Sequence, residues 1–324
     1  MKRPPILACV LFAGCMQTAQ PPAAPATARP EPLPGTKLSI EQLKEQMFHV
    51  SAGKRLKGAW PNGARIAVGL SFDVDNATAT LSTGTLDYEI LSRGEYGAID
   101  GLPRLLRMLD RQQVPASFFI PAASAVLHPQ VIKDIQGASL PHEIGVHGWI
   151  HENLPELDDA AEEERLLTKA IDYLTRASGK RPVGYRAPAW AFSQHTLGLI
   201  RKAGFLYDSS MMAMDEPYEI VSNGQATGLI ELPVDWILDD APYFGRTGAL
   251  PSPEMIFRVY RDEFDLAYEE RTMFMLTMHP HVIGHRSRMK HLDELIAYMK
   301  SKPGVWFATA EQIATYVKQQ QSKG

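Results

Sequence analysis

From Ala64 onward, apolar stretches that read as strands alternate with amphipathic stretches that read as helices. The predicted strands lie in residues 64–75, 116–122, 142–148, 183–189, 205–210, 229–236, 272–280 and 305–310. The predicted helices span 98–114, 129–137, 158–178, 194–203, 253–270 and 289–300, and one more closes the chain. Seven or eight β/α units with strands apolar on both faces predict an α/β fold with a parallel sheet covered by helices. We therefore expect a distorted or incomplete (β/α) barrel, and we see no internal repeat.

The composition is that of one large catalytic domain. The chain has 324 residues, of which 45% are hydrophobic and 22% charged, and its formal net charge is -4. That length suffices for a substantial core. The mild acidity, with no basic cluster beyond short pairs, argues against a nucleic-acid partner.

The N-terminus resembles an export signal. Lys2 and Arg3 precede an apolar run at 6–14 that is too short to remain as a membrane span. "LFAGC", ending at Cys15, resembles a bacterial lipobox, although Phe12 stands where a smaller aliphatic residue is usual. An ordinary secretory signal is the alternative. Cys9 and Cys15 are the only cysteines, so the folded domain has neither a disulfide nor a cysteine metal site.

The segment after the signal is rich in Pro and Ala, as expected of an extended tether. We predict four parts: a signal peptide with lipobox at 1–15, a tether at 16–36, an N-terminal extension at 37–63 and a catalytic domain at 64–324. The protein is expected to be exported as a lipoprotein of the cell envelope, held on a membrane through a lipid on Cys15.

Polar side chains follow most of the predicted strands. In a (β/α) barrel, catalytic residues cluster at the carboxyl ends of the strands. Read in order, these ends supply Asp73, Asp75, His147, His151, Arg186, Asp208, Asp235 and His279.

The stretch "SFDVDNAT" holds two of these residues, Asp73 and Asp75. Side chains two apart on a strand share a face, so both carboxylates reach one volume. They repel each other unless a cation or a proton lies between them. The alternative is a pair of solvated acids in a turn.

"HGWIH" places His147 and His151 four residues apart, which on a helical turn puts both imidazoles on one face. Two unrelated surface histidines are the alternative. Adding Asp75 makes a set of two histidines and one carboxylate, suited to Zn²⁺, Co²⁺, Mn²⁺ or Fe²⁺. Asp73 would then be free to take a proton from water, whose pKa a bound divalent cation lowers from about 16 to roughly 7.

Two more strand-end residues have expected roles at such a site. Arg186, in "YRAPAW", would hold and orient Asp73, or else form a purely structural salt bridge. His279, in "TMHPH", would act as general acid, and its neighbour His281 competes for that role.

The ordered motifs "SFDVD", "HGWIH", "YRAPAW", "YDSS", "ELPVDW" and "TMHPH" resemble the polysaccharide deacetylases of the NodB homology domain, carbohydrate esterase family 4. The resemblance runs from about Ala64 to about Thr315. It implies a (β/α) barrel of the NodB type with an Asp-His-His metal site that hydrolyses N-acetyl or O-acetyl groups on sugars. Zinc is the first expectation for the metal, as a single divalent ion.

The resemblance also implies a role for each site residue. Asp73 would be the base, with Arg186 as its partner, and His279 the acid. Asp75, His147 and His151 would be the metal ligands. The backbone N–H of Ala189 would match the family's oxyanion donor, a dipole that contributes about 3 kcal/mol to lowering a barrier.

The aromatic side chains and the partner of His279 are less tightly specified. Asp235, followed by Trp236, resembles the family's Asp-Trp pair and is our expectation for the residue that orients His279; Asp208 is the second candidate. Trp190 and Trp236 are expected to contact substrate. Together with Trp149 and Tyr243, they fit sugar binding and core packing equally well.

Two departures from the usual family pattern indicate a branch. Val74 separates two aspartates that are adjacent in the commonest form, and "LDDAPYF" points the same way: toward certain bacterial peptidoglycan deacetylases and the related allantoinase-like and cyclic-imide hydrolases. Thr277 stands where many members have a leucine lining the acetyl pocket.

The leading hypothesis is an exported, metal-dependent enzyme that removes N-acetyl groups from an N-acetylglucosamine polymer of the envelope, such as peptidoglycan. The alternatives are an amidohydrolase for a small cyclic amide or imide, an O-acetyl esterase, and a glycan-binding protein without activity. The expected partner is an acetylated glycan. The sequence does not specify an oligomeric state.

Overall fold

The computed structural model describes residues 35–56, 59–157, 159–245 and 251–322. The predicted signal segment, Cys15 and all but the last two residues of the predicted tether lie outside the described residues. Contacts between Cα atoms divide the chain into Met1–Leu43 and Lys44–Gly324. The described part of the first unit holds a short 3₁₀ turn, η1 (Gly35–Lys37), and the first residues of α1 (Ile40–Phe48).

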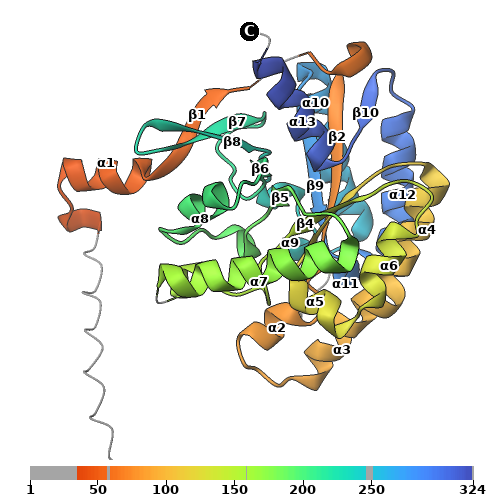
Figure 1. Ribbon diagram of the computed structural model, residues 1–324. Helices are drawn as coiled ribbons and strands as arrows, with labels where there is room; N and C mark the ends of the chain where they lie inside the picture. Colours follow the sequence, from red (N-terminus) through yellow and green to blue (C-terminus); the bar gives the residue numbers. More distant parts are fainter. Residues whose placement is uncertain (1–34, 57–58, 158, 246–250, 323–324) are drawn as a thin grey trace, which may run out of the picture. The chain divides into compact units, whose positions relative to one another are not determined.

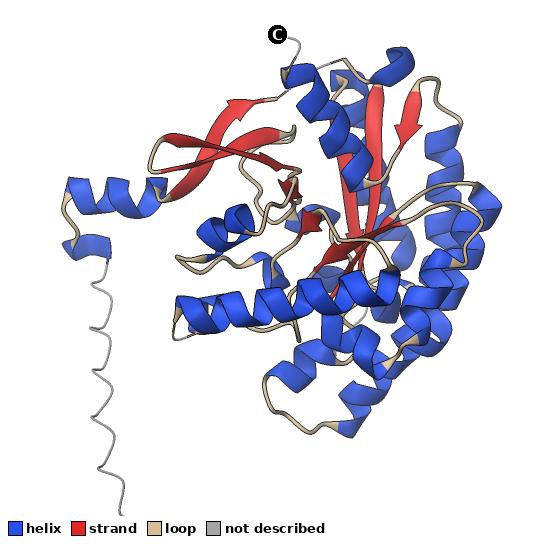
Figure 2. Ribbon diagram, in the orientation of Figure 1, coloured by secondary structure: helices blue, strands red, loops and turns tan. Residues whose placement is uncertain are grey.

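The second unit is a ten-stranded sheet that curls through the centre of the unit, with helices on its outside (Figures 1 and 2). The strands run in the order β1-β7-β8-β6-β5-β4-β3-β2-β10, and β9 pairs with β2. Their bounds are β1 Val50–Arg55, β2 Ile66–Asp73, β3 Ser117–Ile120, β4 Glu143–Val146, β5 Gly184–Tyr185, β6 Tyr207–Asp208, β7 Tyr218–Ser222, β8 Gln225–Glu231, β9 Met273–Met278 and β10 Val305–Phe307. The sheet from β8 round to β9 is parallel, which confirms the prediction of an incomplete (β/α) barrel.

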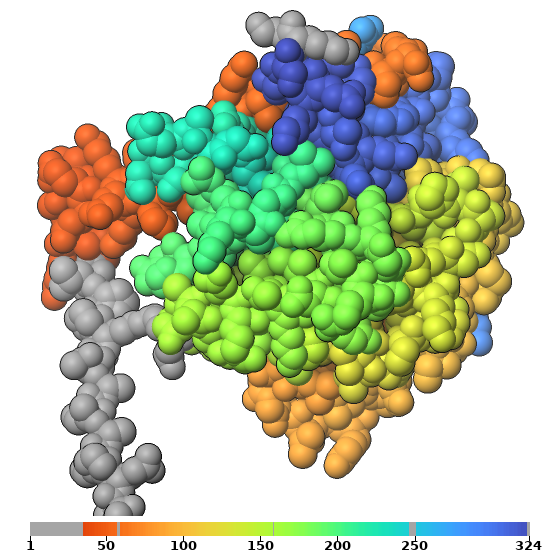
Figure 3. All heavy atoms as spheres, viewed as in Figure 1, coloured from red at the N-terminus to blue at the C-terminus, as the bar shows by residue number. Residues whose placement is uncertain are grey.

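Helices cover the outer face of this sheet. The longer ones are α3 (Tyr88–Tyr96), α4 (Leu102–Gln112), α6 (Gln130–Gln136), α7 (Ala160–Ser178), α8 (Thr196–Lys202), α10 (Pro253–Glu270), α12 (Arg286–Lys300) and α13 (Ala310–Gln321). Shorter helices, α2 (Thr78–Ser82), α5 (Ala122–Leu127), α9 (Ala241–Phe244) and α11 (Pro280–Ile283), follow strands. In Figure 3, α7 in yellow-green and α13 in dark blue form part of the surface that faces the viewer.

β2 pairs with three other strands, and all eight of its residues are buried. Because both faces of a barrel strand are covered, one by the barrel interior and one by helices, its sequence is an apolar run without alternation. One edge of β2 pairs with β9 from Ala67 to Phe72. The other edge pairs with β10 near its start and with β3 near its end, so the strand that ends at Asp73 is held on both sides.

The barrel is open between β8 and β9. Within the part of the chain that the structure describes, the link there is a single bridge between Asp239 and Thr277, supported by the Asp240 N–H, which donates to the Thr277 carbonyl at 3.2 Å. We call this junction the seam. It brings the segment after β8 next to the carboxyl end of β9, where His279 lies.

The sheet also carries an antiparallel extension that the sequence reading did not predict. β7 and β8 form a hairpin whose turn residues, Asn223 and Gly224, both have positive φ (48° and 75°), and β1 pairs with the outer edge of β7. An Asn-Gly pair is a strong signal for such a two-residue turn. No helix among the described residues is long and apolar enough to cross a membrane.

Candidate metal-dependent active site

The loop that carries His147 and His151 is not helical, so the expectation of one helical turn was wrong. Gly148 has φ 74° and His151 has φ 60°, both in the left-handed region. The buried carboxylate of Glu152 accepts hydrogen bonds from the Trp149 N–H at 3.0 Å and the Ile150 N–H at 2.8 Å. These local bonds replace the bonds of a helix and fold the loop back on itself.

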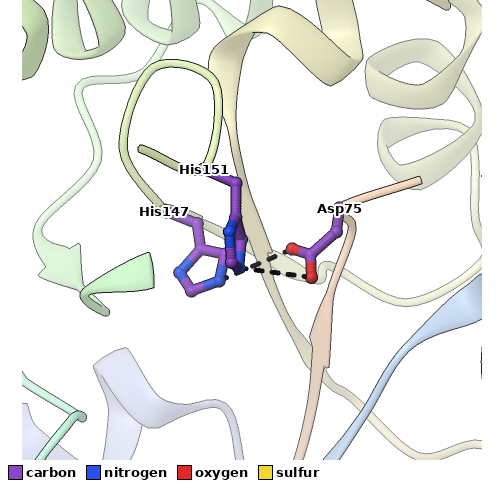
Figure 4. A group of neighbouring side chains, drawn as sticks. All are labelled: Asp75, His147 and His151. Atoms are coloured by element: carbon purple, nitrogen blue, oxygen red, sulfur yellow. Dashed lines mark ion pairs between the residues drawn. The ribbon is translucent and has the colours of Figure 1, made fainter. Parts of the chain in front are cut away.

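The two imidazoles nevertheless face one carboxylate. His147 Nε2 lies 3.5 Å from Asp75 Oδ1, and His151 Nε2 lies 3.6 Å from Asp75 Oδ2 (Figure 4). One ligand atom from each residue falls within 4.8 Å of the other two. The tight loop therefore brings these three groups together as well as a helix would.

The surroundings of this group fit a divalent cation. Asp75 is only 5% exposed, and no hydrogen-bond donor among the described residues reaches its buried Oδ1. His147 Nδ1 lies 2.8 Å from the Arg186 carbonyl, to which it donates, so its Nε2 lone pair points at Asp75. A histidine ligand held in this way through its other ring nitrogen is the usual arrangement around a metal. Two imidazoles and a carboxylate suit zinc and neighbouring transition metals.

The electrostatics agree with that donor set. Burial would raise the pKa of Asp75, but His151, His147 and His279 outweigh it and hold the pKa well below its ordinary value. Burial lowers the pKa of His147 despite the two nearby carboxylates. An ionised carboxylate and a neutral imidazole are the forms that bind metal.

Asp73, on the same strand face, is bound by a buried arginine. Arg186 Nη1 donates to Asp73 Oδ1 at 2.7 Å and to Ser71 Oγ at 3.0 Å. Its other donors are satisfied by Ser209, through Nε to the carbonyl and Nη2 to Oγ, both at 2.9 Å, and the guanidinium lies 4.1 Å from the centre of the Phe119 ring. Arg186 is fully buried, so Asp73 is held in one orientation.

His279 faces the same carboxylate from the opposite side. Its Nε2 lies 3.6 Å from Asp75 Oδ2. On its other edge, Nδ1 lies 2.6 Å from Asp240 Oδ1, and Asp240 Oδ2 accepts the His279 backbone N–H at 3.0 Å. Burial disfavours the imidazolium, yet Asp240 together with Asp239 raises the pKa of His279 well above its ordinary value.

The partner of His279 is thus Asp240, and the expectation that Asp235 or Asp208 orients it was wrong. Asp235 is exposed and accepts the Ile237 N–H at 2.9 Å. Asp208 is buried and binds Ser210. Asp240 was not among the predicted site residues; it lies in "LDDAPYF", which the seam brings to the carboxyl end of β9.

His281, the competitor for the role of His279, is half-buried beside it. Its ring centre is 5.7 Å from that of His279, and its Nδ1 is buried without a described partner. Burial, with the charge of His279, lowers the pKa of His281 to about 3. Of these two histidines, His279 is therefore the one whose Nε2 lies near Asp75 and whose Nδ1 is bound to a carboxylate.

The stretch 187–191 forms a tight turn beside these residues. Ala189 has φ 51° and Trp190 has φ 56°, and the Ala189 N–H has no acceptor among the described residues. Such an N–H is available to a substrate oxygen. The ring of Trp190 lies 4.3 Å from that of Trp236, and Trp236 is 46% exposed whereas Trp190 is buried.

A helical segment whose backbone packs closely against two of the site loops supports them. Between α3 and α4, Gly97–Gly101 forms a π-helical turn. A Cβ at Gly97 would clash with Asn76 and His281, and one at Gly101 would clash with the Pro280 carbonyl. The turn therefore packs tightly against the loops that follow β2 and β9, and π-turns are frequent near functional sites.

A comparison with known proteins identifies the family. The chain is 31% identical over 281 residues to the peptidoglycan deacetylase of Helicobacter pylori, an alignment that spans 77% of this chain and 95% of the relative. The chain belongs to the polysaccharide deacetylase family. Residues 95–207 also match the polysaccharide deacetylase family model. This confirms the resemblance seen in the motifs, and it makes the protein a hydrolase of carbon-nitrogen bonds other than peptide bonds.

Solved structures extend the comparison to the fold. A Mycobacterium smegmatis protein assigned to the polysaccharide deacetylases has a TM-score of 0.76 at 37% identity, with 84% of this chain and 96% of that chain covered. An allantoinase has a TM-score of 0.70 at 26% identity, covering 82% and 93%. In this polysaccharide deacetylase, the family-model match includes His147, His151 and Arg186, whereas Asp73, Asp75 and His279 lie outside it.

Proposed function

We propose that this polysaccharide deacetylase is an exported, metal-dependent enzyme that removes N-acetyl groups from N-acetylglucosamine in an envelope polysaccharide such as peptidoglycan. The observation that carries the proposal is the buried Asp75 carboxylate, which lacks a donor at Oδ1 and faces two imidazole nitrogens. The substrate class is supported by the Helicobacter pylori relative, which is named a peptidoglycan deacetylase.

Asp75, His147 and His151 are the proposed ligands of one divalent ion, with zinc as the first candidate and cobalt, manganese or iron also compatible. When bound, such an ion supplies a Lewis acid that polarises a carbonyl and makes water more acidic. The protein supplies the fixed geometry, because His147 is anchored to the Arg186 carbonyl and Asp75 is buried.

The remaining residues divide the proton transfers and the charge stabilisation between them. Asp73, oriented by Arg186, takes a proton from the attacking water. The Ala189 N–H donates to the oxygen of the acetamide as negative charge develops on it. His279, held at Nδ1 by Asp240, delivers the proton on Nε2 to the departing amine nitrogen. Trp236, the exposed ring of the Trp190 pair, is the proposed contact for the sugar.

The proposed location is the cell envelope. It is supported by the signal-like N-terminus, by the lipobox-like "LFAGC" ending at Cys15, and by the proposed substrate. The variant Cys15→Ala is expected to move the protein from the membrane fraction to the soluble exported fraction. An unchanged membrane fraction in this variant would contradict the lipid anchor.

A second candidate is hydrolysis of a small cyclic amide or imide, favoured by the fold shared with an allantoinase at a TM-score of 0.70. One experiment separates the two. Acetate release from peptidoglycan and from chitooligosaccharides is measured beside ring opening of allantoin and succinimide, each with metal removed by a chelator and then restored. We expect acetate release that stops on chelation and returns with zinc. Ring opening without acetate release would establish the second candidate.

Two matched variants test the division of roles between the aspartates. Asp73→Asn is expected to abolish turnover and keep bound metal, because the amide cannot act as base. Asp75→Ala is expected to lose metal. Equal metal loss in both variants, measured by elemental analysis, would count against the assignment.

A further inference from the structure

A second pair of acids lies behind the site, on neighbouring strands. Asp208 on β6 and Glu231 on β8 are directly opposite each other in the parallel ladder, and both are fully buried. The Ser210 N–H reaches both carboxyl groups, at 3.0 Å from Asp208 Oδ2 and 2.9 Å from Glu231 Oε1. One N–H shared in this way keeps the two groups in contact.

Two carboxylates so placed cannot both be ionised at low cost, because like charges opposite each other in a buried ladder repel. Glu231 Oε2 is buried, and no donor of the described residues reaches it. The side chains of Asp208 and Glu231 also act on each other through a hydrogen bond, which two carboxyl groups can form only if a proton lies between them.

Few other charges lie close to the pair. Arg186 acts on Asp208 electrostatically, but its own hydrogen bonds go to Asp73, Ser71 and Ser209. The buried phenols of Tyr185 and Tyr218 also act on the pair, and they carry no positive charge. A shared proton offsets the repulsion between the two carboxyl groups where no cation is hydrogen-bonded to either of them among the described residues.

The pair is connected to the site through two serines. Ser210 Oγ donates to Asp208 Oδ1 at 2.9 Å and accepts the Ala187 N–H at 2.9 Å. Glu231 Oε1 also accepts the Met211 N–H at 2.9 Å, which fixes the backbone that presents Ser209 to Arg186. The segment from Ser209 to Met211 is thus fastened on one side to the acids and on the other to Arg186 and Ala187.

We propose that Asp208 and Glu231 share one proton and act as a positioning pair, which holds Arg186 and the turn after Ala187 in the arrangement that the reaction needs. The pair touches neither substrate nor metal. The kinetic part of this inference rests on the proposed function, since it assigns the pair to the support of Asp73 and Ala189. The shared proton stands independently of that function.

Infrared spectroscopy of the metal-loaded full chain at neutral pH tests the proton. We expect a carbonyl stretch of a protonated carboxyl group that disappears in Glu231→Gln. Glu143→Gln serves as the control, because Glu143 is another buried carboxyl group in a strand ladder and lies at the amino end of its strand, whereas Asp208 and Glu231 lie at the carboxyl ends of theirs. If Glu231→Gln does not fold, Asp208→Asn is used, and the same band is expected to shift. No band sensitive to either variant would overturn the shared proton.

Kinetics of acetate release test the positioning. Ser210→Ala is expected to lower kcat by about tenfold to a hundredfold with little change in KM, the size of effect that a displaced catalytic group produces. Glu231→Leu is expected to lose activity to a similar extent, while Glu231→Gln retains at least about a third of kcat, because its amide can donate to Asp208 as the protonated acid does. Glu143→Gln should lower thermal stability alone.

The outcomes are distinct. A wild-type kcat in folded Ser210→Ala and Glu231→Leu would overturn the positioning role. Equal losses of kcat in Glu231→Leu and Glu231→Gln would show that a donor at position 231 does not support activity, which would also overturn it. A wild-type protein that releases no acetate would contradict the proposed function, and the infrared band would still decide the shared proton.

Discussion

The two ends of the barrel strands both bury carboxylates, but they treat them differently. At the amino end, Glu143 accepts hydrogen bonds from Ser117 Oγ at 2.7 Å, Tyr207 OH at 2.6 Å and the Glu311 N–H at the start of α13 at 2.8 Å. At the carboxyl end, Asp75 is just as buried, yet Oδ1 has no donor among the described residues. Glu143 thus finds its hydrogen-bond donors within the protein, whereas Asp75 lacks one at Oδ1.

This difference separates a structural polar network from a site. A buried carboxylate with all its partners stabilises the fold and closes one end of the barrel, because its desolvation is offset by hydrogen bonds. A buried carboxylate left without a donor costs free energy in the folded protein unless something arrives to satisfy it. The carboxylate at the carboxyl ends of the strands is therefore open to a ligand at a cost in stability. The carboxylate at the amino ends stabilises the fold and offers no free oxygen to a ligand.

The strongest test removes the unsatisfied carboxylate. Asp75→Ala is expected to lower kcat/KM for acetate release by on the order of 10³-fold or more, since the metal and the geometry around it are lost together. Its melting temperature in the absence of metal should lie close to that of the metal-free wild type, because the variant loses both a buried carboxylate that lacks a donor at Oδ1 and the attraction of that carboxylate to three histidines. Marked destabilisation of metal-free Asp75→Ala would show that the carboxyl end is as complete as the amino end.

The next effect concerns His279, whose pKa burial would lower but Asp240 raises. As general acid, His279 must be protonated, so kcat falls as pH rises through its pKa. Asp240→Asn removes the charge that raises this pKa, so the alkaline limb of kcat should move to lower pH, with a loss of roughly 10²-fold at neutral pH. Asp235→Asn is the control and should leave the profile in place. A profile that moves in Asp235→Asn and stays in Asp240→Asn would reverse the assignment.

The third test addresses the amino end. In Glu143→Gln, an amide NH₂ group replaces one carboxylate oxygen, so at least one of the three donors that bind Glu143 faces another donor. We expect this to lower the free energy of unfolding by about 1–3 kcal/mol. Because this network is far along the strands from Asp75, kcat should change by less than about twofold. Denaturant unfolding beside acetate release measures both. A large loss of kcat with unchanged stability would show that Glu143 serves the reaction and not the fold.

The smallest effect is expected at the rim. Trp236 is 46% exposed and contacts the buried Trp190. Trp236→Ala should raise KM for a chitooligosaccharide by about threefold to tenfold, the loss of one aromatic stacking contact, with little change in stability or kcat. Trp149→Ala offers a comparison, since Lys169 lies 3.6 Å from the centre of the Trp149 ring and already covers it. Equal KM changes in both variants would argue against a specific contact at Trp236.

Much of this fold could be read from the sequence because barrel strands have a simple signature. β2, β3 and β9 are continuous apolar runs bounded by polar residues, and the helices between them have clear apolar faces. The hairpin β7–β8 was missed because β8 is exposed over its first half and alternates weakly, although Asn223-Gly224 marks its turn.

The site was predictable where residues lie directly at strand ends, and not where geometry depends on longer connections. Asp73, Asp75 and His147 follow strands, and the structure brings them together as expected. Asp240 reaches His279 only because the seam joins the segment after β8 to β9, which no local pattern encodes. The turn held by Glu152 was missed for a related reason, since a helical spacing of histidines can also be met by a loop.

The seam has a consequence for motion. Most neighbouring strands of the barrel are joined by ladders of several residue pairs, whereas the described backbone link between the β8 and β9 sides is one bridge with the Asp240 N–H bond to Thr277. Local opening there costs less than opening a ladder, so the Asp240 amide should exchange its hydrogen with solvent sooner than the amides within β2. The Asp240 carboxylate is bound to His279 across the same junction, so such an opening would loosen the side chain that orients the proposed acid. The seam therefore links local opening of the barrel to the acid of the proposed reaction.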